Sequence, residues 1–131
     1  MVLFDTSAWI YFFRRKRKVD EHALDQVATC PPVIQEVLQG IGAQGREYDM
    51  VEQGFLALPL LDRSIPVARY VEAAELYRTG RRKGLTIRSS MDCLIAAIAI
   101  DHELPVVHQD RDFKQIEKFT PLQVISASSF F

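Results

Sequence analysis

Five carboxylates in this sequence either follow a short apolar run or lie in the first turns of a helical pattern. They are Asp5, Glu36, Asp92, Asp110 and Asp112. In an open parallel sheet, ligands bind beyond the carboxyl ends of the strands, where loops and helix N-termini converge. We therefore expect these five acids to share one end of a sheet.

A gathering of acids of this kind favours one type of chemistry. Several carboxylates at one place repel each other strongly unless protons or a cation neutralise them. Mg²⁺ and Mn²⁺ take oxygen ligands and are held by few carboxylates and several waters. A bound divalent ion lowers the pKa of a water molecule and stabilises the charge that grows on a phosphodiester during attack. The pattern therefore predicts metal-dependent hydrolysis of phosphodiesters.

Each acid also has a purely structural interpretation. Asp5 can cap a helix, and Ser89 with Asp92 matches the S-x-x-D capping pattern. Glu36 can lie on a solvated face, and the last two acids fit a turn that starts a helix. Taken singly, the structural interpretation is favoured for each. Taken together, so many acids at one end of a sheet favour a site.

The elements that must position these acids alternate between short apolar runs and helical patterns. Strands are expected at residues 2–4, 27–30, 56–61, 105–108 and 123–125. Helices are expected around residues 9–13, 20–26, 31–40, 46–55, 66–79, 89–100 and 113–119. Parallel strands need crossover helices, so this alternation predicts an α/β fold, a three-layer α/β/α sandwich with a short, mainly parallel central sheet. A chain of 131 residues suits a single domain over residues 1–131.

Three local features refine this outline. Gly80 is expected to mark the exit of the helix that begins at Pro66. Pro59 favours an edge position for the strand at 56–61. The segment SSMDCLIAAIAI, residues 89–100, is apolar on most faces and should be the buried central helix.

Composition and charge exclude several classes of protein. The net charge of −1 gives no whole-molecule field that would gather nucleic acid. Two cysteines far apart, Cys30 and Cys93, fit neither a disulfide framework nor a paired zinc-ligand motif, and they suit a reducing compartment. The N-terminus lacks the order of a secretory signal, and no apolar run is long enough to cross a membrane. We expect a cytoplasmic protein with no membrane partner.

Several segments resemble a known family. DTSAWI at residues 5–10 resembles the opening motif of PIN domains, and PPVIQEVLQG at 31–40 resembles the segment that carries the family's glutamate. The second half, from SSMDCLIAAIAI through LPVVHQDRDF, is similar to VapC-type toxins. The resemblance spans the whole chain.

The resemblance implies a PIN-like fold and a Mg²⁺- or Mn²⁺-dependent endoribonuclease, the toxin of a toxin–antitoxin pair. It implies an acidic quartet of Asp5, Glu36, Asp92 and Asp110, with Asp112 as an additional acid. Family members vary in which acid of the last motif binds metal, so both of the last two acids are candidates. Ser7 would assist from the first helical turn. An RNA substrate, a homodimer and an antitoxin peptide in the groove are the implied partners.

Basic residues near the acids are candidates for contact with RNA. Arg88 lies just before the capping serines of the central helix, and Arg111 belongs to the same turn as the last two acids. The runs at 14–18 and 78–83 can also flank the site, but a charge run is more often a solvated face, which we favour for 14–18. The histidines lack metal-ligand spacing and are interpreted as structural or surface residues; they are His22, His102 and His108.

Two other classes stay open at this point. A receiver domain is also α/β with an acidic Mg²⁺ pocket, but it needs an acidic doublet after the first strand, where only Asp5 stands. Asp62, after the run at 56–61, is the one feature that fits a phosphoacceptor. The other class is a non-catalytic binding module whose acids are only helix caps.

Overall fold

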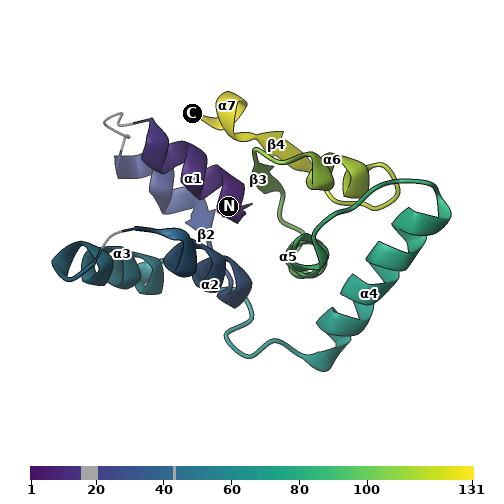
Figure 1. The fold of residues 1–131 in the computed structure, drawn as a ribbon, viewed down its shortest axis with the longest axis horizontal. Helices are drawn as coiled ribbons and strands as arrows, with labels where there is room; N and C mark the ends of the chain where they lie inside the picture. The colour runs from purple at the N-terminus through teal and green to yellow at the C-terminus, as the bar shows by residue number, and fades with distance from the viewer. Residues whose placement is uncertain (16–20, 43) are drawn as a thin grey trace.

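The computed structural model describes residues 1–15, 21–42 and 44–131. Four short strands form its sheet in the order β2-β1-β3-β4, and each neighbouring pair is parallel. The strands are β1 (Val2–Phe4), β2 (Val27–Ala28), β3 (Val106–His108) and β4 (Val124–Ser126). This architecture confirms the predicted α/β fold with a short parallel sheet (Figure 1).

Helices separate the strands along the chain (Figure 1). They are α1 (Thr6–Arg14), the 3-10 helix η1 (Glu21–Gln26), α2 (Pro31–Gly40), α3 (Arg46–Ala57), α4 (Val67–Arg82), α5 (Ser90–Asp101), α6 (Arg111–Glu117) and α7 (Ala127–Phe130). The helical stretch expected at 20–26 matches η1 except for its first residue, which lies outside the described residues. Among the described helices, none is both long and apolar enough to span a membrane.

The strand order determines which face each helix covers. The connection from β1 to β2, through α1, runs in one direction across the sheet. The connection from β2 to β3, which ends in α5, and the connection from β3 to β4, through α6, run in the other direction. Because parallel crossovers are right-handed, α1 lies on one face of the sheet and α5 and α6 lie on the other. α4 packs along α5 on the outside (Figure 1). Strands and α5 together form the core, and every residue from 92 to 99 is buried, as predicted for the central helix.

The prediction of a strand at residues 56–61 is wrong. Helix α3 continues to Ala57, and only Leu60 pairs with the sheet, as an isolated parallel bridge to Thr29. The Thr29 N–H donates to the Pro59 carbonyl at 2.9 Å, and the Leu61 N–H donates to the Thr29 carbonyl at 2.8 Å. Helix α3 runs two residues past its expected end at Phe55, whose side chain is buried, and Pro59 has no N–H to extend a ladder. The bridge does lie beside β2, the edge strand, where the proline was expected to place it.

Gly80 does not mark the exit of α4. The helix runs on to Arg82, and the left-handed residue after it is Gly84, with φ +73°. Gly80 is buried, and a Cβ atom there would lie 2.6 Å from Cδ1 of Ile87. The missing side chain therefore lets the chain after Gly84 fold back against the helix, and the second glycine supplies the turn.

Candidate metal centre

Asp5 lies at the carboxyl end of β1 and caps α1. Its Oδ1 accepts a hydrogen bond from the Ala8 N–H at 3.0 Å. The Ser7 hydroxyl donates toward both oxygens of the same carboxylate, at 2.8 and 2.9 Å. Asp5 is nearly fully buried. A buried carboxylate with this many donors has a fixed orientation, so the cap also positions a potential ligand.

Glu36 reaches the same end of the sheet from α2. The Thr6 hydroxyl donates to Glu36 Oε1 at 2.9 Å, which connects the first turn of α1 to the middle of α2. Glu36 is therefore not on a free solvated face, as its structural interpretation required. Because Thr6 follows Asp5 directly, the contact brings the second acid next to the first.

Asp92, Asp110 and Asp112 form the centre of the cluster. One carboxylate oxygen from each lies within 4.8 Å of those from the other two. Asp92 comes from the first turn of α5, Asp110 caps α6, and Asp112 lies in the first turn of α6. Asp92 and Asp112 are buried and Asp110 is partly exposed. Two buried acids and one accessible acid make a site that opens toward solvent on one side.

Asp112 also holds the two helices together. Its Oδ2 accepts hydrogen bonds from the backbone N–H groups of Arg88 and Ser89, both at 3.0 Å. These residues lie immediately before α5, so one carboxylate connects the start of α5 to the start of α6. Asp110 differs, since among the described residues its side chain accepts a hydrogen bond from the Asp112 N–H alone, at 3.0 Å.

The electrostatic field of the cluster includes all five acids. Burial raises the pKa of Asp5 from 3.8 to about 7, against the lowering effect of its hydrogen bonds, and the charge of Asp110 adds to the rise. Burial raises the pKa of Asp92 to about 8. The further causes for Asp92 are the negative charges of Asp5, Asp110, Asp112 and Glu36. Without a counter-ion, the site therefore holds protons near neutral pH.

The donor set fits a divalent cation. In the described part of the chain, Asp92 Oδ2 and Asp112 Oδ1 are buried and have no hydrogen-bond partner. A buried polar atom without a partner costs free energy, so these two oxygens indicate a missing ligand. Carboxylate oxygens without nitrogen or sulfur donors suit a hard divalent ion.

Of the three predicted substrate-contact residues, Ser7 bonds to Asp5 and Arg88 lies near Asp110 and Asp112, whereas Arg111 has no such contact among the described residues. The Arg88 Nε lies 3.7 Å from Asp112 Oδ1 and its Nη2 lies 3.9 Å from Asp110 Oδ1, with 64% of the side chain exposed. Arg111 is exposed on α6, and within the described residues its guanidinium makes no hydrogen bond or ion pair. Arg88 can reach an anion at the site without moving far.

Three residues contribute to the site without having been singled out for it. Thr6 orients Glu36, the Gln109 N–H donates to Ser7 Oγ at 2.8 Å, and His108 Nδ1 accepts from the Asp110 N–H at 3.2 Å. Burial lowers the pKa of His108, so the ring is a neutral acceptor. This agrees with its interpretation as a structural residue. The signal for Thr6 was present in the sequence, as a hydroxyl between Asp5 and Ser7, but its partner lies 30 residues away.

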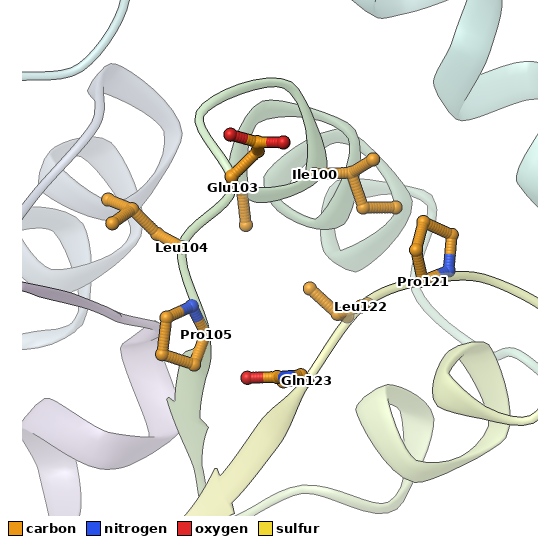
Figure 2. A pocket seen from close by; sticks show the side chains of 8 residues that line it. Ile100, Glu103, Leu104, Pro105, Pro121, Leu122 and Gln123 are labelled. Atoms are coloured by element: carbon orange, nitrogen blue, oxygen red, sulfur yellow. The ribbon is translucent and has the colours of Figure 1, made fainter.

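The other candidate features lie away from this cluster. Figure 2 shows a pocket of about 270 Å³ before the starts of β3 and β4, and Glu103 is its one charged lining residue. Asp62, the candidate phosphoacceptor, pairs with His102 Nε2 at 2.8 Å, at the C-terminal end of α5. Ten residues of helix, about 15 Å, separate His102 from Asp92. Asp62 is therefore outside the acidic cluster.

Comparisons with known proteins agree with this geometry. The PIN domain family matches residues 2–119. Ribonuclease VapC11 of Mycobacterium tuberculosis is 38% identical over 135 residues, covering 96% of this chain and 98% of that protein.

Two solved structures share the fold. VapBC-5 from Mycobacterium tuberculosis, a member of the VapBC family of toxin–antitoxin systems, has a TM-score of 0.68 at 25% identity and covers 95% of this chain and 97% of that one. VapBC-1 from nontypeable Haemophilus influenzae has a TM-score of 0.73 at 17% identity and covers 98% of this chain and 99% of that one.

Proposed function

This chain belongs to the PIN-domain family, among the VapC ribonucleases, and we propose that it is an endoribonuclease that hydrolyses RNA phosphodiester bonds with a divalent cation at its acidic cluster. The observation that carries this proposal is the approach of Asp92, Asp110 and Asp112 within 4.8 Å, with two buried oxygens left without partners. Family membership and the position of Asp62 both count against a receiver domain.

Mg²⁺ or Mn²⁺ is the proposed ion, because both take oxygen ligands and keep several waters. Asp92 and the unpartnered oxygen of Asp112 would bind the ion, with Asp110 as the accessible ligand. Asp5 and Glu36 would add negative charge beside it. When bound, such an ion supplies an activated water and neutralises charge on the phosphoryl oxygens. All five acids are therefore assigned to the catalytic site.

The chain's own residues orient these groups and the substrate. Ser7 fixes both oxygens of Asp5, and Thr6 fixes Glu36, so neither carboxylate needs to reorganise during the reaction. Arg88 is exposed beside Asp110, and its guanidinium is proposed to hold a phosphate of the RNA. Arg111 stays a weaker candidate for the same role, since among the described residues its guanidinium makes no ion pair with the acids.

The proposed biological role is that of the toxin in a toxin–antitoxin pair, held inactive by a cognate antitoxin. The support is the likeness to VapC11 and to the toxin–antitoxin member VapBC-5. A homodimer is proposed as well, because α4 exposes Val67, Tyr70 and Val71 by 77%, 52% and 60%. A single domain over residues 1–131 and a cytoplasmic location stay predictions.

The test is cleavage of a mixed RNA pool with Mg²⁺ or Mn²⁺, comparing the wild type with Asp92→Asn. We expect the variant to lose activity by about 100-fold or more, since it removes a ligand and its charge. Glu75→Gln, an exposed acid on α4, is the matched control and should cleave like the wild type. Cleavage that survives both chelation and Asp92→Asn would contradict the metal-dependent mechanism, and no cleavage under any condition would favour a binding module.

A further inference from the structure

We propose that a groove on α1, beside the acidic cluster, binds the RNA strand next to the cleaved phosphate, with its arginines holding phosphate and its aromatic wall holding a base. We call it the α1 groove, and its lining residues are Ser7, Ile10, Tyr11, Arg14, Arg15 and Gln109. Its volume is about 320 Å³. This inference rests on the proposed ribonuclease function.

The α1 groove is continuous with the acidic site through Ser7. The Ser7 hydroxyl donates to Asp5 and accepts the Gln109 N–H at 2.8 Å, so both lining residues border the metal centre directly. Asp110 follows Gln109 in the chain. An RNA strand whose phosphate is attacked at the acidic cluster extends away from the cluster in two directions. The α1 groove lies in one of them.

Helical spacing aligns the lining residues into a path. Ser7, Tyr11 and Arg14 are separated by four and three residues, so they lie on one face of α1. Seven residues of helix give a path of about 10 Å from Ser7 to Arg14. The path therefore leads from the acidic cluster to a positive charge over a length suited to a short stretch of nucleotide chain.

The wall of the groove has a rigid aromatic part. The Arg15 guanidinium lies over the Tyr11 ring, 4.2 Å from its centroid. Tyr11 also stacks with Phe131, with 6.1 Å between the ring centroids and 12° between the ring planes. An RNA base can stack on a guanidinium plane or an aromatic ring, and a platform already supported by a second ring loses little entropy on binding.

The charges favour a nucleic acid over other occupants. Two exposed arginines face the groove, and none of the described residues that line it is acidic. The acidic cluster would repel an anionic strand without a cation, whereas Arg14 and Arg15 attract it directly beside the cluster. This revises the interpretation of residues 14–18 as a solvated face for Arg14 and Arg15; residues 16–18 lie outside the described residues.

The experiment measures binding and catalysis separately. Fluorescence anisotropy with a labelled single-stranded RNA of mixed sequence, in Mg²⁺ and in the Asp92→Asn background, reports binding without cleavage. We expect Arg14→Ala and Arg15→Ala each to raise the Kd about 10-fold. Each should also make the dependence of the log of the association constant on log salt less steep, by roughly 0.7. In the otherwise wild-type enzyme, the same substitutions should raise KM and leave kcat unchanged.

Matched variants test the geometry. Tyr11→Phe keeps the ring and should bind like the wild type, whereas Tyr11→Leu should weaken RNA binding. Arg63→Ala, an exposed arginine next to Asp62 and so outside the acidic cluster, is the control for loss of charge and should leave the Kd unchanged. Thermal melting checks that each variant is folded.

Two results would overturn the inference. One is that wild-type enzyme cleaves RNA while Arg14→Ala and Arg15→Ala match Arg63→Ala in Kd, salt slope and KM. The other is that the groove variants weaken binding of a polyglutamate peptide and not of RNA, which would make the surface a protein-binding one. If the wild type cleaves no RNA but the groove variants still weaken RNA binding, the ribonuclease proposal fails and the RNA site stands.

Discussion

Thr6 and Ser7 are neighbours in the sequence, yet their hydroxyl groups position two different carboxylates. Ser7 donates to Asp5 within the same turn, while Thr6 donates to Glu36 across 30 residues. The Thr6 bond engages one oxygen of Glu36, whereas the Ser7 hydroxyl approaches both oxygens of Asp5. At the scale of single residues, hydroxyl groups therefore hold Asp5 and Glu36 in place. Burial makes the charged form of such carboxylates unfavourable.

The raised pKa values of Asp5 and Asp92 link folding stability to pH. For an acid whose pKa is higher in the folded than in the unfolded state, the unfolded chain loses its proton first as pH rises. The destabilisation is absent below about pH 4, grows between pH 4 and about 8, and is constant above. A divalent cation replaces those protons, so it should stabilise most at high pH.

We therefore expect Asp92→Asn to melt increasingly above the metal-free wild type as pH rises from 4 to 8. The difference at pH 8 should be about 4 °C or more, since each kcal/mol changes the Tm of a domain of this size by roughly that amount. Mn²⁺ should raise the wild-type Tm more at pH 8 than at pH 5 and have little effect on the variant. Differential scanning calorimetry measures both, with Glu75→Gln as control; a Tm difference independent of pH would contradict this linkage.

At the scale of elements, one turn determines how α5 and α6 meet. Asp110 caps α6, and Asp112 reaches back to the backbone of Arg88 and Ser89 before α5. The capping of α6 by Asp110 also explains why this helix begins at Arg111, two residues earlier than the sequence predicted. The two acids of the last motif thus have different structural roles, although nothing in the sequence ranks them as metal ligands.

Substitution of each acid by asparagine should separate these roles. Asn caps helices as well as Asp does, so Asp110→Asn should cost activity and little stability. Asp112→Asn weakens two hydrogen bonds of a buried charge and should lower the free energy of unfolding by about 1–3 kcal/mol as well as activity. Urea unfolding at pH 7 with bound Mg²⁺, alongside RNA cleavage, distinguishes them. Equal loss of stability in both variants would show that Asp112 is not the element that joins the helices.

At the scale of the whole molecule, α4 carries exposed apolar side chains near its N-terminal end. Its exposed residues Val67, Tyr70 and Val71 lie at i, i+3 and i+4, so they form one stripe. α4 packs along the buried α5 (Figure 1), and each of the three residues keeps more than half of its surface exposed. A stripe of this kind on a covering helix suits burial against another chain.

We expect light scattering to give the mass of two chains, twice 15.0 kDa, for the wild type. Val71→Asp places a charge in the stripe and should shift the protein to a monomer, while folding stays intact because the side chain is 60% exposed. Met50→Asp, an equally drastic change at a 66% exposed apolar residue of α3, is the control and should remain a dimer. A monomeric wild type, or a dimer unaffected by Val71→Asp, would place the interface elsewhere or exclude it.

The sequence by itself determined the alternation of strands and helices, the buried central helix and the five acids next to strand or helix ends. These features depend on local periodicity and on capping chemistry, which neighbouring residues carry. Predictions from the sequence were wrong at residues 56–61, where the contact with Thr29 is only a bridge, and at Gly80, which packs against Ile87. Only the tertiary structure joined Thr6 to Glu36, Asp112 to the start of α5 and Gln109 to Ser7. Those contacts cross the sheet or connect separate helices, and no local pattern contains the distance between residues that meet only after the chain has folded.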